Sequence, residues 1–120
     1  VNTDRPGAEH RDGMILDYCR LNGITVQAWS PYQYGDNEGS YLGNQHFEVL
    51  NQAIGALAAE KGISDEAVVA AWILRHPARI QVLAGTMNQE RLARIVKASD
   101  HPLTREEWYK IYIAAGNYKP

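Results

Sequence analysis

Only two segments of this 120-residue chain have the character of β-strands, and helical segments separate them. Residues 24–30 alternate in character, are rich in β-branched residues and end at Pro31, while residues 80–84 form a second short apolar run. Strands that are separated by helices belong to parallel sheets. Two parallel strands cannot make a sheet that is buried on both faces, so this order predicts an α/β segment of a larger structure.

About five helices are predicted around these strands. The third carries apolar residues nearly all round from 67 to 74, which indicates contact on more than one side. The last begins with a capping box, in which Thr104 is the cap and Glu107 stands three residues further on. Start and stop signals bracket the helices at Asp12 and Gly23, Phe47 and Gly62, Ser64 and Pro77, Asn88 and Ser99, and Thr104 and Gly116.

Two stretches lack this periodicity. Residues 1–11 are polar and are expected to form a loop that packs against nothing, which favours a truncated chain over a designed domain boundary. Residues 32–46 carry three glycines and are expected to form a long functional or mobile loop. The chain is therefore read as one segment, divided into a loop (1–11), a helix–strand unit (12–31), a loop (32–46), two helices and a strand (47–86), and C-terminal helices (88–120).

The composition limits the class of partner and the compartment. With 45% hydrophobic residues, 22% charged residues and a net charge of −2, the chain is expected to be one soluble globular unit that binds neither nucleic acid nor anionic membrane. Cys19 is the single cysteine, which rules out an internal disulfide and favours a reducing compartment. No apolar run reaches the roughly twenty residues of a membrane span, and the expected location is the cytoplasm.

The second strand leads directly into a helix, in the sequence I-Q-V-L-A-G-T-M-N-Q-E-R-L from Ile80 to Leu92. A helix N-terminus offers unpaired N–H groups and the positive end of the helix dipole, both of which favour an anion. Asn88 is a good cap, and Arg91 can grip two phosphate oxygens at once. An ordinary strand–turn–helix connection with a solvated arginine has the same local sequence, so both interpretations stay open at this point.

The other chemically active residues have structural explanations. Asp65 and Glu66 can be read as paired carboxylates, but the first turn of a helix favours acidic residues for its dipole. Trp29 fits a strand end in the core, and Cys19 fits a small buried position in a helix. Apolar helical faces carry Trp72 and Trp108, which are expected in the core. No metal site is predicted, because the histidines are far apart, at His10, His46, His76 and His101.

Four passages resemble the aldo-keto reductase family, in the right order and spacing. D-G-M-I-L-D-Y-C-R-L-N-G-I-T-V-Q-A-W-S-P (Asp12–Pro31) resembles the family's passage from helix 6 into strand 7, which ends in aromatic-Ser-Pro. Residues 63–77, I-S-D-E-A-V-V-A-A-W-I-L-R-H-P, resemble the helix before strand 8. G-T-M-N-Q-E-R-L (85–92) is similar to the cofactor loop, and L-T-R-E-E-W (103–108) to the closing helix. The resemblance covers nearly the whole chain from residue 12.

The resemblance implies the C-terminal portion of a (β/α)8 TIM barrel that uses NADPH to reduce aldehydes and ketones. In such barrels the loops after strands 7 and 8 commonly make the phosphate site. Trp29 matches the aromatic residue that stacks on the nicotinamide ring, and Arg91 matches the arginine that holds the 2′-phosphate. The other implied cofactor-binding positions are Ser30, Pro31 and Tyr32 beside the pyrophosphate, and Gly85, Thr86, Met87 and Asn88 in the loop near the adenosine phosphate.

The chain departs from the family pattern in two ways. Ile95 stands where many members have an asparagine that contacts adenine. The family's catalytic Asp, Tyr, Lys and His lie on strands 2 to 4, which this sequence does not contain, so no catalytic residue is assigned and the isolated chain is expected to be inactive. The alternatives are a barrel fragment that self-associates or pairs with the missing barrel half, and a truncated product or proteolytic remnant without a function of its own.

Overall fold

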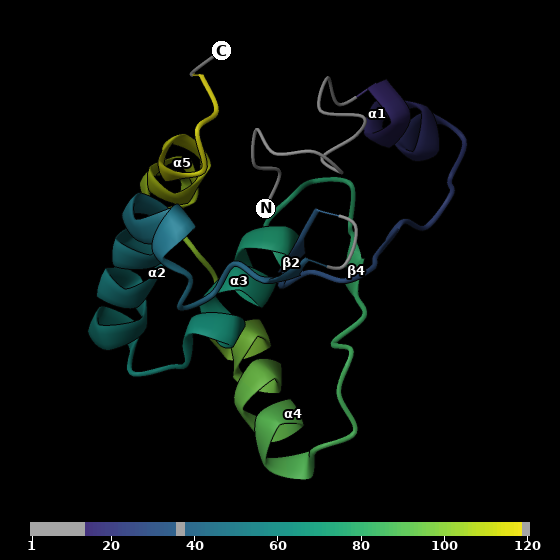
Figure 1. The fold of residues 1–120 in the computed structure, drawn as a ribbon. Coiled ribbons are helices and arrows are strands. Elements are labelled where there is room, and N and C mark those ends of the chain that lie inside the picture. Colours follow the sequence, from purple (N-terminus) through teal and green to yellow (C-terminus); the bar gives the residue numbers. More distant parts are fainter. Residues whose placement is uncertain (1–13, 36–37, 119–120) are drawn as a thin grey trace.

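The computed structural model describes residues 14–35 and 38–118 (Figure 1), so the predicted loop over residues 1–11 and the predicted cap at Asp12 lie outside the described residues. The five predicted helices are present, with short strands between them. In chain order the elements are α1 (Met14–Leu21), β1 (Gln27–Ala28), β2 (Gln33–Tyr34), β3 (Gly39–Ser40), the 3-10 helix η1 (Gln45–Phe47), α2 (Glu48–Lys61), α3 (Asp65–Leu74), β4 (Gln81–Val82), α4 (Gln89–Val96), the 3-10 helix η2 (Lys97–Asp100) and α5 (Arg105–Ala114).

The start of α3 and the end of α2 lie where the sequence indicates. Helix α2 is followed by Gly62, which adopts a left-handed conformation with φ of 66° and so ends the helix. At the start of α3, the hydroxyl of Ser64 accepts a hydrogen bond from the N–H of Ala67. The fourth helix is shorter than predicted. Its α-helical part ends at Val96, and residues 97–100 continue as the tighter η2.

The two predicted strands are neighbours and run parallel, as expected for this order of elements. β1 pairs with β4 in the register Gln27 to Gln81 and Ala28 to Val82. The pairing is extended by backbone hydrogen bonds from Gln81 N–H to the carbonyl of Val26 (2.9 Å) and from Leu83 N–H to that of Ala28 (3.1 Å). The strands are shorter than the predicted ranges, and the fold of the described residues is α/β, with five helices and a two-stranded parallel sheet.

One face of the β1–β4 sheet packs on the core, and the other is open. Ala28 and Val82 pack against the buried cluster, whereas Gln27 and Gln81 are exposed and hydrogen-bond to each other through their side chains at 3.1 Å. Successive residues of a strand point to opposite faces, which explains this alternation.

Helix α3 is the centre of the core, as its all-round apolar sequence predicts. It lies between α2, α4 and β4 (Figure 1). Six of its ten residues are buried: Ala67, Val68, Val69, Ala70, Ala71 and Ile73. These side chains point to different faces, so α3 is enclosed on more than one side, and its small alanines allow the neighbouring elements to approach closely.

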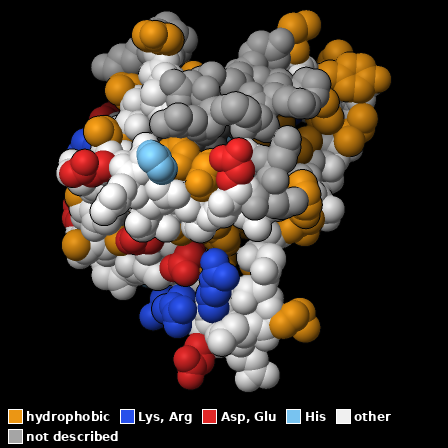
Figure 2. Space-filling view, viewed as in Figure 1, with side chains coloured by type: hydrophobic (Ala, Val, Ile, Leu, Met, Phe, Trp, Pro, Cys, Tyr) orange, Lys and Arg blue, Asp and Glu red, His pale blue; other side chains and the backbone are white. Residues whose placement is uncertain are grey.

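Helix α1 contrasts with α3, because none of the residues 14–21 is buried. Leu21 is 85% exposed, and Met14 and Tyr18 are also largely exposed. Figure 2 shows hydrophobic side chains gathered at the upper right of the molecule, over α1. The prediction that Cys19 is a small buried residue is wrong, since its side chain is only partly covered. Within residues 14–35 and 38–118, no residue of α1 is enclosed in the core.

The prediction of a structureless loop over residues 32–46 is also wrong. β2 and β3 form an antiparallel hairpin in this stretch, paired in the register Gln33 to Ser40 and Tyr34 to Gly39. Tyr41 is almost fully buried and donates a hydrogen bond from its hydroxyl to the carbonyl of Pro31 at 2.7 Å. The side-chain amide of Asn51 on α2 donates to the carbonyl of Tyr41 at 2.8 Å. A buried aromatic ring and an amide on the neighbouring helix therefore fix this segment.

Trp72 and Trp108 pack face to face, but they are partly exposed and not fully in the core as predicted. Their ring centroids are 4.7 Å apart and their planes differ by 6°. Each indole N–H donates to the backbone carbonyl of the other residue at 3.0 Å. This reciprocal arrangement satisfies both indole donors and joins α3 to α5.

Glu107 is the one charged residue among the buried positions of the described chain, and its partners explain why it is tolerated there. Its carboxylate accepts a hydrogen bond from Thr104 N–H at 2.7 Å, which confirms the predicted capping box, and forms an ion pair with Lys61 at 2.9 Å. Burial raises the pKa of this carboxyl, but the Thr104 hydrogen bond and Lys61 outweigh burial, so the pKa is lowered from 4.5 overall. The ionised form is therefore the one that the fold stabilises.

We expect Glu107→Gln to lower the free energy of unfolding by roughly 1–3 kcal/mol at pH 7, because the ion pair with Lys61 is lost and the hydrogen bond from Thr104 N–H no longer has a charged acceptor. Because the folded-state pKa is depressed, this contribution is present above the unfolded pKa of 4.5 and is lost as the pH falls through the folded-state value. Urea unfolding at pH 7 and at pH 3 measures the difference in the free energy of unfolding between the variant and the original chain. The control is Glu106→Gln, which changes an exposed neighbour. If Glu107→Gln lowered the free energy of unfolding by the same amount at both pH values, this explanation would be contradicted.

Candidate functional site

The parallel pairing of β1 and β4 brings two distant parts of the sequence to one end of the sheet. Because the strands run in the same direction, the segment after β1 (residues 29–32) and the segment after β4 (residues 85–88) both leave at their carboxyl ends. Ligands in open or closed parallel sheets bind at this end of the strands. All nine residues that the sequence singles out for cofactor binding lie in these two segments or in the first turn of α4.

The segment after β1 has one exposed aromatic residue and two buried residues. Trp29 is 77% exposed, so its indole is available to a ligand and is not the core residue of the alternative interpretation. Ser30 adopts a left-handed conformation with φ of 49°, which is uncommon for a residue other than glycine. Pro31 and Tyr32 are buried. The chain therefore turns sharply at Ser30 and enters the protein interior at once.

The segment after β4 is a tight turn that leads into α4. Gly85 has φ of 64°, a conformation that glycine adopts without strain. The hydroxyl of Thr86 accepts a hydrogen bond from Asn88 N–H at 3.1 Å, and the side-chain oxygen of Asn88 accepts one from Arg91 N–H at 2.8 Å. The predicted cap at Asn88 is thus confirmed. Met87 is almost fully exposed at the tip of the turn.

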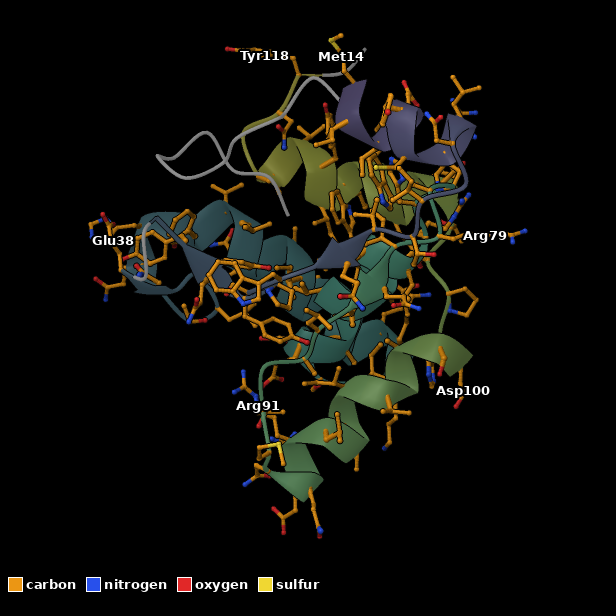
Figure 3. The ribbon with its side chains drawn as sticks, turned by 90° about the vertical axis from the view of Figure 1, so that its right-hand side faces the viewer. Met14, Glu38, Arg79, Arg91, Asp100 and Tyr118 are labelled. Carbon is orange, nitrogen blue, oxygen red and sulfur yellow. The ribbon has the colours of Figure 1, made fainter. Side chains whose placement is uncertain are left out.

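Arg91 lies near the N-terminal end of α4, at the opposite end of the molecule from Met14 (Figure 3). Its Nε is 3.5 Å from a carboxylate oxygen of Glu66, and its guanidinium carbon lies 5.5 Å from the centroid of the Tyr32 ring. The Tyr32 hydroxyl in turn donates to the backbone carbonyl of Glu66 at 3.4 Å. These three residues, called here the Arg91 cluster, join the loop after β1 to the first turns of α3 and α4.

The hydroxyl of Tyr32 stays protonated at physiological pH. Burial, and then the negative charge of Glu66, raise the pKa of Tyr32 to about 12, while the positive charge of Arg91 opposes this shift. The phenol is therefore a neutral platform and a hydrogen-bond donor, and it does not compete for the charge of Arg91. A neutral aromatic face beneath a guanidinium holds it in place by a cation–π contact and leaves its charge intact.

The sequence does not predict the roles of three residues in this region. Glu66 is predicted only as a helix-dipole partner, although its carboxylate also pairs with Arg91 across 25 positions of the chain. Tyr41 and Asn51 fix the loop after β1, and nothing in the local pattern indicates their pairing. The only available signal is the presence of tyrosines in a stretch that is otherwise rich in glycine and polar residues.

The departure at Ile95 has a structural explanation. Ile95 is buried and belongs to the core cluster, packed with α3 residues, so its side chain cannot reach a ligand on the surface of α4. Apart from this position α4 is exposed or half-exposed, and Figure 2 shows Lys and Arg side chains on its surface. An adenine contact of the kind common in the family is therefore absent at this position.

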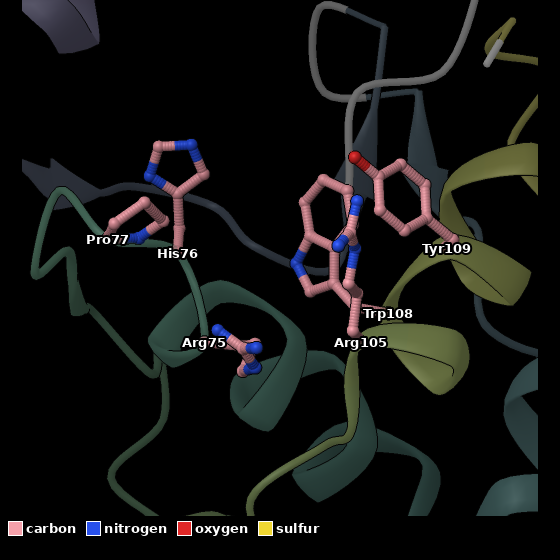
Figure 4. Close-up of a pocket in the computed structure, with 6 residues that line it drawn as sticks. All are labelled: Arg75, His76, Pro77, Arg105, Trp108 and Tyr109. Atoms are coloured by element: carbon pink, nitrogen blue, oxygen red, sulfur yellow. The ribbon is translucent and has the colours of Figure 1, made fainter. Parts of the chain in front are cut away.

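A separate hollow of about 350 Å³ lies between the end of α3 and the start of α5 (Figure 4). It contains none of the nine predicted residues. Two arginines line it, Arg75 and Arg105; Arg75 Nε donates to the carbonyl of Leu103 at 3.1 Å, and Arg105 lies 5.8 Å from the Tyr109 ring centroid. The full lining is Arg75, His76, Pro77, Arg105, Trp108 and Tyr109.

No group of three or more His, Cys, Asp or Glu residues in the part of the chain that the structure describes could hold a metal ion. None of the described helices is long and apolar enough to cross a membrane.

Comparison with known proteins assigns the family. The model of the Aldo/keto reductase family matches residues 8–115, which is most of the chain, and the chain therefore belongs to this family. Members of the family generally depend on a nicotinamide nucleotide, and the family fold is a TIM barrel. Eight of the nine positions that the sequence predicts for the nucleotide follow the carboxyl ends of β1 and β4, and the ninth, Arg91, lies in α4.

The curated relatives are oxidoreductases and are much longer than this chain. The chain is 33% identical over 101 residues to 6-dehydroglucose reductase of Agrobacterium fabrum, an alignment that covers 83% of this chain and 32% of that protein. It is 32% identical over 104 residues to the oxidoreductase YdhF of Escherichia coli, covering 86% of this chain and 34% of the relative. The chain spans about a third of the length of these relatives.

Proposed function

We propose that this chain is the cofactor-binding, C-terminal part of an NADPH-dependent aldo-keto reductase, in which β1 and β4 are strands 7 and 8 of a (β/α)8 barrel. The observation that carries the proposal is the meeting of two segments at one end of a parallel pair, with Arg91 beside them. Fixed backbone donors and a guanidinium at the carboxyl end of barrel strands favour a bound phosphate.

The residues present fit the nucleotide in their chemistry. Trp29 offers an exposed aromatic face to a flat ring, and Arg91 offers a cation that Tyr32 holds in place. Ser30, Pro31, Thr86 and Asn88 would lie along the phosphates, with Gly85 and Met87 completing the turn. NADPH supplies a hydride to a carbonyl carbon when it is bound; the part of this chain is to hold and orient the nucleotide. The choice of NADPH over NADH rests on Arg91, because a fixed cation favours the additional 2′-phosphate.

No residue of this chain is assigned a catalytic role. The family resemblance attributes proton donation to a tyrosine that is tuned by a lysine, both on strands that this sequence does not contain. The chain alone should therefore bind a nucleotide without reducing a carbonyl. Reduction of an aldehyde or ketone is the proposed activity of the complete barrel, and a cytoplasmic location is proposed with it.

A second candidate function is assembly, in which the chain pairs with other barrel strands or with a copy of itself. The exposed apolar side chains of α1 and the open face of the β1–β4 sheet favour it. Both surfaces would be covered in a closed barrel, where helices surround the sheet and side chains fill its interior. Met14, Tyr18 and Leu21 are the residues that such pairing would bury.

A single preparation of the chain tests both candidates. Calorimetry with NADP⁺ and NAD⁺ is expected to show weak binding that favours NADP⁺, and NADPH with a reactive aldehyde is expected to show no turnover. Equal binding of both nucleotides, or none, would remove the proposed cofactor site, and measurable turnover would overturn the assignment of no catalytic residue. Light scattering at micromolar concentration decides the second candidate, since a clean monomer contradicts self-association.

A further inference from the structure

Two contacts hold Arg91, and they have opposite consequences for its charge. The Tyr32 ring lies 5.5 Å from the guanidinium carbon and is neutral. The Glu66 carboxylate lies 3.5 Å from Nε and is an anion. The first contact positions the guanidinium without opposing its charge, whereas the second offsets part of the positive potential that a phosphate would meet.

We propose that Glu66 is a specificity-determining residue, whose carboxylate reduces the charge that Arg91 presents to a 2′-phosphate and so weakens the preference for NADP over NAD. The inference rests on the proposed function of Arg91. It adds a residue on a different helix, α3, that sets how strongly the site distinguishes the two nucleotides. Like charges at close range oppose each other, so Glu66 also repels the phosphate directly.

The position of Arg91 does not depend on the charge of Glu66. The Tyr32 ring that supports the guanidinium is buried, and its hydroxyl donates to the backbone carbonyl of Glu66, which no side-chain substitution removes. The backbone of Arg91 is fixed separately, by the cap hydrogen bond to Asn88. Glutamine at position 66 keeps the length of the side chain and an oxygen that can accept from Nε. Glu66→Gln thus removes the charge and leaves the contacts.

Solvent limits the size of the effect. The side chains of Arg91 and Glu66 are 37% and 22% exposed, so water and salt screen their interaction in part. We therefore expect Glu66→Gln to tighten the binding of 2′,5′-ADP by roughly three- to tenfold, in keeping with the modest strength of partly exposed ion pairs. Binding of 5′-AMP, which has no 2′-phosphate, should change by less than about twofold, and the gain should shrink as the salt concentration rises.

Calorimetry on the full chain with 2′,5′-ADP and 5′-AMP is the test, with Glu90→Gln as the matched control. Glu90 lies next to Arg91 in the first turn of α4 and is exposed, so its substitution makes the same change in net charge without removing the Glu66 contact to Nε. A gain for 2′,5′-ADP with Glu66→Gln and a smaller one with Glu90→Gln supports the proposal. Equal gains, no gain, or weaker binding with Glu66→Gln overturn it.

The failure of this inference can be told apart from the failure of the proposed function by one further variant. If Arg91→Gln weakens 2′,5′-ADP binding and Glu66→Gln leaves it unchanged, the result supports the phosphate site and contradicts the proposed role of Glu66. If Arg91→Gln leaves 2′,5′-ADP binding unchanged, or if the original chain binds neither 2′,5′-ADP nor 5′-AMP, the proposed cofactor site is contradicted. The proposed role of Glu66 is then contradicted as well.

Discussion

Arg91→Gln is expected to reduce the affinity of the chain for 2′,5′-ADP by roughly ten- to a hundredfold, because hydrogen bonds to a charged group contribute about 1.5–3 kcal/mol. The affinity for 5′-AMP should change little, since that ligand lacks the phosphate that Arg91 is proposed to hold. The variant is therefore expected to lose the preference for 2′,5′-ADP over 5′-AMP and to keep its affinity for 5′-AMP. Calorimetry with the two ligands at one salt concentration measures both affinities.

The matched control for this variant is Arg94→Gln, one turn further along the same helix. Arg94 is exposed and contributes the same formal charge to α4. If the two substitutions weaken 2′,5′-ADP binding equally, the effect reflects the net charge of the helix and not a phosphate site at Arg91. Arg91→Lys adds a second comparison, because a lysine keeps the charge but cannot make the two parallel hydrogen bonds of a guanidinium.

Ile111→Ala is expected to lower the free energy of unfolding by about 2–5 kcal/mol, which is the usual cost of removing a large buried aliphatic side chain. Ile111 is 0% exposed and lies on α5, which packs against α2 and completes the core around α3. Since small domains are stable by only about 5–15 kcal/mol, this change should remove a large part of the stability of the chain. Urea unfolding, followed by far-UV circular dichroism, provides the measurement.

Ile113→Ala is the control for that prediction, because Ile113 lies two residues away on the same helix and is 42% exposed. It should cost less than about 1 kcal/mol, as is usual for substitutions outside the core. Similar losses for both variants would mean that α5 does not bury one face against α2.

Much of the local structure follows from the sequence for identifiable physical reasons. The capping box at Thr104 and the cap at Asn88 are confirmed because they depend on residues three positions apart, within one helical turn. The central position of α3 is confirmed because its apolar residues cover more than one face. The parallel pairing of β1 with β4 follows from the helices between them, since such a crossover permits only that direction with ease.

The errors have a common cause in contacts between distant residues. The stretch over residues 32–46 has a composition typical of an irregular loop, yet a hydrogen bond from Tyr41 to Pro31 and another from Asn51 order it. Cys19 has an apolar pattern around it and is nonetheless partly exposed, because the described residues of other elements do not cover α1. The local sequence pattern indicates which face of a helix is apolar, but it does not indicate whether another element covers that face.

By itself, the sequence determined the order of the five helices and of the two parallel strands, the caps, the family resemblance and the positions expected to contact a nucleotide. All of these depend on residues within a few positions of each other or on a known motif. Only the tertiary structure brought Tyr32, Glu66 and Arg91 together, from three elements that are far apart in the chain. The charge that Arg91 can offer to a phosphate depends on these neighbours, and electrostatic interactions act through space and not along the sequence.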